Sequence, residues 1–149
     1  MAIDIVTVAR GWIGTPYRHQ ASCKGAGCDC LGLLRGVWRE LRGAEPEDIP
    51  PYTPDWAEAR GAETLRDALA RHLTPVTTDA IAPGDVALFR MTRFVSGRAP
   101  ACGTPAKHCG IVASRGAART LIHACQNRAV REEIFSSFWR VRLAFAFRM

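Results

Sequence analysis

The sequence has no long apolar run and no recognisable export signal. None of its 149 residues fall in a stretch that approaches the roughly 18 consecutive apolar residues of a membrane-spanning helix. The first 20 residues lack the basic start, apolar core and small-residue cleavage site of a secretory signal. We therefore expect a chain that is made in the cytoplasm and has no membrane span.

The sequence also lacks a basic arm, although its formal net charge is +6. A basic surface attracts polyanions such as nucleic acid, anionic membranes or the anionic polymers of a bacterial envelope. Nucleic-acid-binding proteins usually gather Lys and Arg on one face or arm. Because the charge is scattered here, we expect no specific nucleic-acid binding.

Paired C-x2-C cysteines are absent, although cysteine itself is abundant. The six are Cys23, Cys28, Cys30, Cys102, Cys109 and Cys125. A chain that folds in a reducing compartment should not depend on disulfides. Cys23, Cys28 and Cys30, together with Cys102 or His108, could instead bind zinc or an iron–sulfur cluster. Their C-x4-C-x-C spacing, however, is not the usual spacing of metal ligands. We predict no metal and no other cofactor, with Cys109 and Cys125 as small core residues.

Neither an internal repeat nor a domain boundary interrupts the chain. A length of 149 residues suits one compact core, and 48% hydrophobic with 23% charged residues is typical of a globular protein. These properties predict a single domain over residues 1–149.

Helical periodicity is confined to the first half of the chain. Apolar residues at helical spacing predict a helix at 3–13, a second from Cys30 to a stop at Gly43, and a third at 63–73. Loops are expected at 19–28 and in the proline-rich connection 43–62.

Short apolar runs typical of strands fill the second half. A turn at 83–85, fixed by Asp85, leads into a strand at 86–89, and after a loop at 91–106 come runs at 108–113, 120–125, 129–134 and 140–147. In the last run, Val141 and Leu143 are predicted to face one side while Arg140 and Arg142 face the other. Helices followed by strands predict an α+β fold with an antiparallel sheet.

Cys30 is placed where a thiol ionises readily. Asp29 is a suitable N-cap for the second helix, so Cys30 lies in its first turn, near unpaired N–H groups and the positive end of the helix dipole. Such a position favours the thiolate. The alternative for Cys30 is a buried structural thiol.

Two histidines follow at a spacing that suits neighbouring strands. His108 and His123 are 15 residues apart, with turn residues 114–116 between them. Nucleophilic cysteine catalysis needs an imidazole to exchange protons and a third group to orient that imidazole. Adjacent antiparallel strands would bring the two rings side by side, one in each role. His19 and His72 have no such partners, and we expect them to be peripheral.

The order and wording of these motifs resemble the NlpC-type cell-wall cysteine peptidases, a papain-like family that cuts peptides of bacterial peptidoglycan. The stretches that carry the resemblance are GTPYR at 14–18, DCLGL at 29–33, PGDV at 83–86, HCGIV at 108–112 and IHA at 122–124. Together they span most of the chain in the family's order. The resemblance implies a papain-like NlpC-type fold, with N-terminal helices packed on a C-terminal antiparallel sheet.

The resemblance also implies roles for individual residues. Cys30 would be the nucleophile, His108 the general base and acid, His123 the group that orients His108, and Tyr17 a pocket residue with its hydroxyl near the nucleophile. The amide of Cys30 would help to stabilise the oxyanion. The implied substrate is a peptidoglycan stem peptide, cleaved through a thioester, and the family's preferred bond joins γ-D-glutamyl to diaminopimelate.

Three departures from the family pattern affect the biological role. Leu31 stands where the family usually has serine, and the connections at 43–73 and 91–106 are long. We expect no appended cell-wall-binding module. Without a signal peptide, the chain looks like a phage or gene-transfer-agent tail protein that acts on the periplasmic cell wall and is held by a tail-tip hub or baseplate partner.

Three other functions remain open. One is a catalytically silent, structural tail-tip module with the same fold. A second is acyl transfer by a related thiol fold, although in one branch of those enzymes the histidine precedes the cysteine. The third is a metal-binding module.

Overall fold

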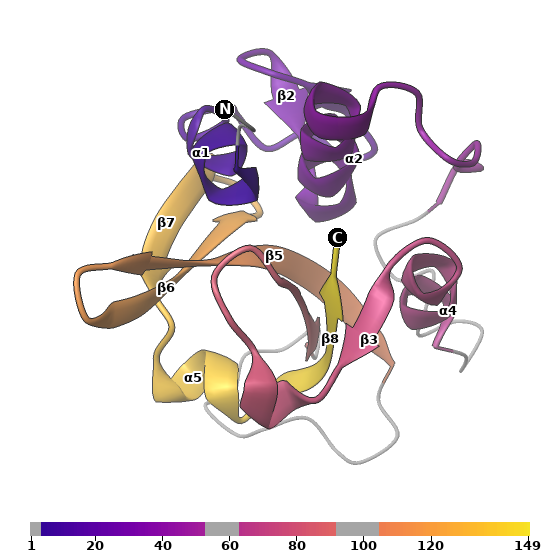
Figure 1. The fold of residues 1–149 in the computed structure, drawn as a ribbon. Helices are drawn as coiled ribbons and strands as arrows, with labels where there is room; N and C mark the ends of the chain where they lie inside the picture. Colours follow the sequence, from indigo (N-terminus) through magenta and orange to yellow (C-terminus); the bar gives the residue numbers. More distant parts are fainter. Residues whose placement is uncertain (1–3, 53–62, 92–104) are drawn as a thin grey trace.

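The computed structural model of the chain describes residues 4–52, 63–91 and 105–149. The α-helices of six residues or more precede the main sheet along the chain, as the periodicity predicts (Figure 1). Within these ranges no helix is long and apolar enough to cross a membrane.

The first two helices begin where their capping residues predict. Helix α1 (Ile5–Arg10) is capped by Asp4, whose carboxylate accepts a hydrogen bond from the Val6 amide. Helix α2 (Cys30–Arg42) is capped by Asp29 through the Gly32 amide at 2.7 Å, and it stops at Gly43, whose φ is +86°. A positive φ suits glycine, so both ends of α2 follow from local sequence.

The predicted loop at 19–28 contains a small hairpin. Strands β1 (Ser22–Cys23) and β2 (Gly27–Cys28) pair antiparallel there, and the hairpin packs against the start of α2. A Cβ on Gly32 would lie 1.8 Å from the Ala21 carbonyl oxygen. Gly32 therefore lets the chain before the hairpin pass directly over the first turn of α2.

The remaining elements form an antiparallel six-stranded sheet with short helices at its margins. In chain order they are α4 (Thr64–Ala70), β3 (Thr74–Val76), η1 (Thr78–Ala80), β4 (Val86–Arg90), β5 (Ala106–Arg115), β6 (Ala118–Ala124), β7 (Val130–Ile134), α5 (Ser137–Arg140) and β8 (Leu143–Arg148). The strand order is β3-β8-β4-β5-β6-β7, and the pairings are antiparallel. The α+β fold prediction is confirmed. Asp85 fixes the turn before β4, accepting from the Ala82 amide at 2.9 Å.

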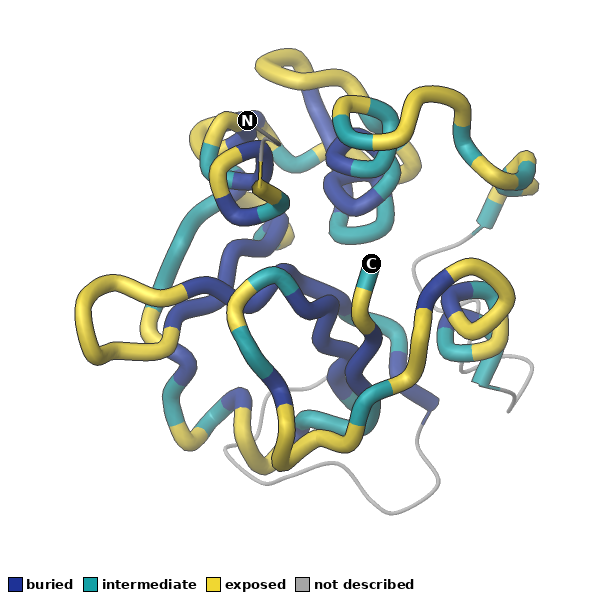
Figure 2. Tube along the Cα trace, in the orientation of Figure 1, coloured by how far each residue is buried: buried dark blue, intermediate teal, exposed yellow. Residues whose placement is uncertain are grey.

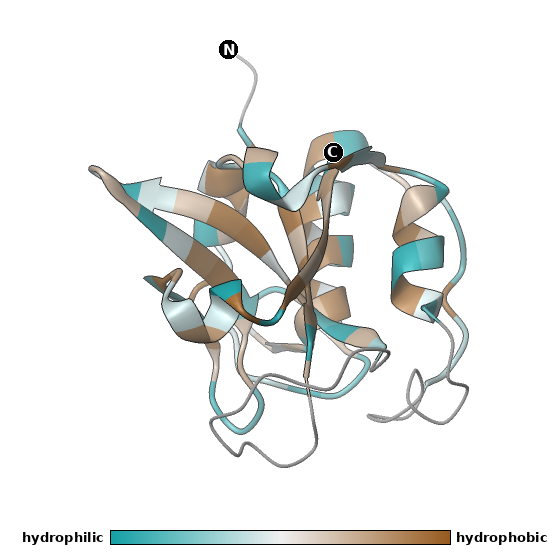
Figure 3. Cartoon of the chain, turned by 90° about the horizontal axis from the view of Figure 1, so that it is seen from below, coloured by the Kyte–Doolittle hydropathy of each residue, from teal (hydrophilic) through white to brown (hydrophobic). Residues whose placement is uncertain are grey.

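Both faces of the sheet are covered. Helices α1 and α2 lie on one side and α5 on the other (Figure 1), and the central strands are buried between them (Figure 2). Hydrophobic residues lie along these strands (Figure 3). On the helix side, Val37 of α2 packs in one cluster with Ile111 and Ile122, while Trp139 of α5 packs with Phe89 on the opposite face. Each large apolar side chain buried in this way contributes roughly 1.5–3 kcal/mol.

The prediction for the last strand is partly wrong. Residues Ser137–Arg140 form α5, and β8 begins only at Leu143. As a result Val141 is 59% exposed and Arg142 only 4% exposed, the reverse of the expected alternation. The guanidinium of Arg142 stacks 3.7 Å from the centre of the Phe138 ring and donates to the Phe138 carbonyl. A helical turn has a period of 3.6 residues, so the two-residue alternation does not apply there.

Candidate active site

The three residues predicted for catalysis converge at one end of the sheet. Cys30 is the first residue of α2, His108 lies near the start of β5, and His123 near the end of β6. The Cys30 sulfur is 3.9 Å from the Lys107 carbonyl oxygen. The sheet therefore meets the first turn of α2 beside His108.

A network of hydrogen bonds fixes the chain immediately before Cys30. The Asp29 side chain is buried and accepts from the amides of Gln20 and Gly32, each at 2.7 Å, and from the Tyr52 hydroxyl. These bonds hold the first turn of α2 and so fix the backbone that carries the sulfur. His19 contacts the rim of this network, where its Nε2 atom lies 2.7 Å from the Tyr52 carbonyl oxygen.

The surroundings of Cys30 favour its thiolate. A hydrogen bond from the Cys109 thiol and the hydrogen bond and charge of His108 hold the pKa of Cys30 well below its usual range, against the opposing effect of burial. Cys109 also contacts the Cys30 carbonyl oxygen at 3.3 Å. Its hydrogen bond to Cys30, followed by burial and the negative charge on Cys30, raises the pKa of Cys109 well above its usual range. The pair therefore carries its charge on Cys30, while Cys109 stays a neutral donor.

The two histidines are joined directly. The His108 Nε2 atom lies 3.0 Å from His123 Nδ1, and the ring planes are nearly perpendicular at 84°. This contact leaves His108 Nδ1 as the ring nitrogen available for exchange with the thiol. Burial, together with the charges of His108 and Arg131, lowers the pKa of His123 to about 3. His123 is consequently neutral near pH 7 and presents one donor and one acceptor.

Trp139 shields the histidine pair. Its ring stacks on His108 with a centroid distance of 5.5 Å and meets the His123 ring at 4.9 Å. Trp139 is itself 6% exposed. A hydrogen bond covered by an aromatic ring is protected from competing water, so the His108–His123 contact is stronger than an exposed one. No local motif pointed to Trp139, because it contacts the pair only through the packing of α5.

Glu133 is a second neighbour that sequence reasoning missed. Its Oε1 atom lies 2.5 Å from His123 Nε2. Strand β7 pairs with β6 so that Glu133 is opposite Leu121 and Arg131 opposite His123. Side chains two residues apart share a face of the sheet, which places Glu133 on the face of His123. An exact register for the β6–β7 hairpin would have revealed this neighbour.

Tyr17 approaches the site from the chain before the β1–β2 hairpin. It forms an isolated bridge with Cys28, and its amide donates to the Arg128 carbonyl at 3.0 Å. Burial and the charges of Cys30 and Asp29 raise its pKa. Its hydroxyl is therefore a neutral donor in the neighbourhood of the thiolate, as is that of Tyr52, whose pKa is raised by burial and by its bond to Asp29.

The cysteines proposed as alternative metal ligands are not assembled as such in the described part of the chain. Cys23 is exposed, Cys28 is buried in the core beside α1 and α2, and Cys102 lies outside the described residues. The group of potential ligands that does assemble there is a different one, namely His123, Cys125 and Glu133, with candidate atoms within 4.8 Å of one another. The His123–Glu133 hydrogen bond already accounts for two of these three.

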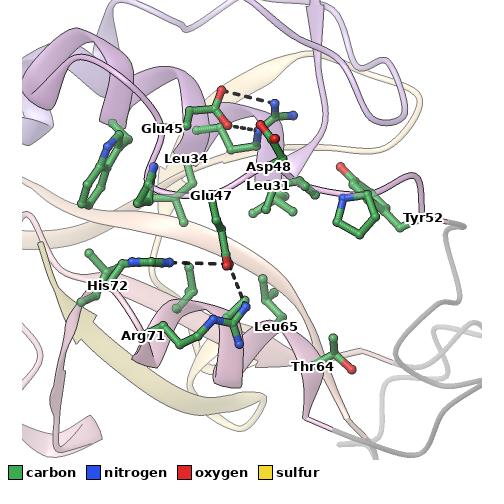
Figure 4. Close-up of a pocket in the computed structure, with 18 of the residues that line it drawn as sticks. Leu31, Leu34, Glu45, Glu47, Asp48, Tyr52, Thr64, Leu65, Arg71 and His72 are labelled. Atoms are coloured by element: carbon green, nitrogen blue, oxygen red, sulfur yellow. Dashed lines mark hydrogen bonds and ion pairs between the residues drawn. The ribbon is translucent and has the colours of Figure 1, made fainter.

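A cavity of about 630 Å³ lies beside the first turns of α2 (Figure 4). Leu31 and Leu34 of α2, Leu65 of α4 and the segment 45–52 contribute to its walls. Glu47 reaches across the cavity to the two residues that follow α4, pairing with Arg71 at 2.7 Å and His72 at 3.6 Å. Leu31, which directly follows Cys30 in the chain, lines the cavity, whereas Cys30, His108 and His123 are not among its lining residues.

Comparison with solved structures shows which fold this is. The chain is similar to the NlpC/p60 domain of the peptidoglycan hydrolase SagA, with a TM-score of 0.61, 23% identity, and coverage of 97% of this chain and 96% of that domain. An NlpC/p60 family protein from Bacillus cereus gives a TM-score of 0.61 at 18% identity, and this chain, covered in full, spans 40% of its length. A protein described as a putative xylanase from Bacteroides fragilis gives a TM-score of 0.56 at 13% identity, and the match covers 96% of this chain and 100% of that one.

These likenesses establish the NlpC/p60 papain-like fold. No family model and no curated protein matches the sequence. Identities of this size do not carry an activity from one protein to another, since a single fold supports many functions. The function has to be argued from the site.

Proposed function

We propose that this chain is a peptidoglycan hydrolase that cleaves an amide bond of the stem peptide through a thioester on Cys30. The observation that carries the proposal is the convergence of a thiolate-favouring cysteine at a helix N-terminus with a directly linked histidine pair. Its occurrence in the NlpC/p60 fold, together with the resemblance of the sequence motifs to that family, supports peptidoglycan as the substrate class.

The proposed reaction begins with attack on the amide carbonyl. The Cys30 thiolate adds to the carbonyl carbon, and the oxyanion that forms is stabilised by the backbone amide of Cys30 at the start of α2. Protonated His108 then gives its Nδ1 proton to the leaving amine as the C–N bond breaks. The products of this half-reaction are a free amine and an acyl thioester on Cys30.

Hydrolysis of the thioester restores the enzyme. Neutral His108 removes a proton from a water molecule, whose oxygen attacks the thioester carbonyl. Collapse of the second tetrahedral intermediate releases the carboxylic acid and the Cys30 thiolate, with the proton kept on His108. His123 orients the His108 ring throughout, and Tyr17 supplies a hydroxyl donor to the substrate.

We further propose that the cavity beside α2 extends the substrate groove. Two observations support this. Leu31 lines the cavity and directly follows Cys30 in the chain. Tyr52 also lines the cavity, and its hydroxyl donates a hydrogen bond to the carboxylate of Asp29. The long connection through 45–52 and α4, unusual for the family, would then shape specificity for the bond between γ-D-glutamyl and diaminopimelate.

Delivery by a phage-like or gene-transfer-agent tail stays a prediction from the sequence. In that role the chain would sit at a tail tip, on a hub or baseplate partner, with access to the periplasmic cell wall. Co-purification of the chain with tail particles tests this role independently of activity. A tail-bound chain that digests no peptidoglycan would support the silent structural module instead.

Mass spectrometry of purified sacculi incubated with the chain tests the hydrolase proposal. We expect new soluble peptides whose termini identify the cleaved bond, and none with the Cys30→Ala variant. Cys23→Ala, which alters an exposed cysteine, is the matched control and should digest like the unmodified chain. Equal digestion by Cys30→Ala would reject the mechanism.

A further inference from the structure

We propose that Glu133 is a positioning residue of the site, which acts through His123 to fix the direction of its hydrogen bond with His108. The inference deepens the proposed function and rests on it for its catalytic meaning. It concerns which ring nitrogens of His108 and His123 carry protons, and this can be measured without any substrate.

The geometry aligns four side chains from three strands and one helix. Glu133 Oε1 lies 2.5 Å from His123 Nε2, and His123 Nδ1 lies 3.0 Å from His108 Nε2. His108 in turn interacts with Cys30. The His123 side chain is 1% exposed and the Glu133 side chain 28% exposed, so the acidic end of the series faces solvent and the middle is shielded.

A carboxylate accepts hydrogen bonds and does not donate them. The neutral His123 ring carries one proton, and Glu133 holds that proton on Nε2. His123 Nδ1 must then be the acceptor, so His108 Nε2 must be the donor. A His108 ring that already holds a proton on Nε2 can gain and lose a second proton on Nδ1 without breaking this contact.

Without the carboxylate, the His108–His123 bond can reverse. His123 would carry its proton on Nδ1 and donate it to His108 Nε2. His108 would then have to keep its single proton on Nδ1, and protonating it further would break the bond. The charged state of His108, which supports the Cys30 thiolate, would be lost.

The charged and titratable groups around His123 are consistent with this arrangement. Arg131 approaches the second oxygen of Glu133 at 3.8 Å, and its charge disfavours a second proton on His123. Cys125 lies near Glu133, and burial, together with the charge of Glu133, raises the pKa of Cys125. His108 opposes a proton on His123 and Cys30 favours one. Trp139 covers the pair from α5.

The neighbouring residue Glu132 provides the matched control. It lies on the same strand but binds Arg10, Arg115 and Thr120 at 2.7–2.9 Å, away from the histidines. Glu132→Gln removes one negative charge from β7, as Glu133→Gln does, and leaves the His123 contact in place.

The test combines histidine nitrogen NMR with iodoacetamide labelling of Cys30, followed by peptide mapping. In the unmodified chain we expect the Nε2–H form of His123. Glu133→Ala should lose that form. Measured at a pH below about 8.5, the ordinary thiol pKa, Cys30 labelling should slow by about tenfold, the change that a rise of about one unit in the pKa of Cys30 produces. Glu133→Gln carries an amide that can donate as well as accept, so it no longer fixes the direction of the bond and should weaken both readouts. Glu132→Gln should change neither.

Several results would overturn the proposal. They are an unchanged His123 proton position in Glu133→Ala, equal slowing of labelling by Glu132→Gln, or a stoichiometric metal ion bound by His123, Cys125 and Glu133 on elemental analysis. Because neither readout uses peptidoglycan, failure of sacculus digestion would reject the proposed function while leaving this inference to be judged on its own.

Discussion

Gly110 of β5 lies so close to His123 of β6 that there is no room between them for a methyl group. A Cβ on Gly110 would be 3.1 Å from the His123 Cβ and 2.7 Å from the Leu121 Cδ1. Real Cβ contacts are rarely this short. The missing side chain therefore lets His123 approach β5 and reach His108, two residues before Gly110.

We predict that Gly110→Ala disturbs the site more than the fold. Overpacking of this kind costs about 1–3 kcal/mol in stability. The added methyl should push His123 away from His108, and sacculus digestion should fall by more than the loss of folded protein explains. Thermal unfolding and digestion rates measure the two effects. Gly36→Ala is the control, since its Cβ would meet Trp12 at 2.0 Å, far along α2 from the histidines; equal loss of activity in both variants would contradict the prediction.

Cys109→Ala should make Cys30 less reactive. The Cys109 thiol is the leading cause of the low pKa of Cys30, and alanine removes that donor without adding bulk. We expect the pKa of Cys30 to rise and its alkylation to slow at pH values below about 8.5, the ordinary thiol range. Labelling kinetics against pH check this. If the pH profile of Cys30 labelling is the same in Cys109→Ala as in the control Cys23→Ala, the Cys109 thiol does not lower the pKa of Cys30.

Glu132 should make the fold sensitive to acid. A hydrogen bond from Arg10, helped by those of Arg115 and Thr120, lowers the pKa of Glu132 to about 2. Because the folded pKa lies below the unfolded one, the stabilisation is complete above about pH 4.5 and is lost as the pH falls towards 2. Glu132→Gln should cost about 2 kcal/mol near neutral pH and flatten this part of the stability profile. Urea unfolding between pH 2 and 7 measures the free energy of unfolding. If this free energy changes with pH in the Glu132→Gln variant as it does in the unmodified chain, Glu132 is not the source of the acid sensitivity.

Filling the cavity beside α2 should separate substrate binding from chemistry. Ala68 of α4 lines the cavity, and Ala68→Trp would occupy much of it. If the cavity receives the substrate, sacculus digestion should drop several-fold while iodoacetamide labels Cys30 as before. Ala70→Trp, on an exposed position of the same helix, serves as the control. Undiminished digestion by Ala68→Trp would exclude the cavity from the groove.

Local sequence is sufficient to predict the start of α2 and the strands of the histidines. Asp29 caps the helix through a contact three residues away, and the turn residues before β6 fix the β5–β6 hairpin. Short-range preferences of this kind are encoded within a few residues. Sequence neighbours therefore place Cys30 at a helix start and the two histidines on paired strands, whereas the approach of Cys30 to His108 depends on how α2 packs against β5.

The neighbours of that trio depend on long-range packing and are not predictable in the same way. Glu133 reaches His123 only through the register of β6 and β7, and Trp139 reaches His108 only because α5 folds back over the sheet. The same helical turn invalidates the alternation expected for Val141 and Arg142. Side-chain periodicity predicts a face, but not which distant element covers it.

The central claim is that Cys30 and His108 form a reactive pair, and the pH dependence of Cys30 alkylation tests it most directly. Labelling with iodoacetamide, followed by peptide mapping to separate the cysteines, would be compared in the unmodified chain, His108→Ala and the control His72→Ala. We predict that Cys30 in the unmodified chain and in the control reaches its full rate well below about pH 8.5, the approximate pKa of an ordinary thiol, and that His108→Ala loses this behaviour. A Cys30 that titrates like an ordinary thiol in all three proteins would contradict the account.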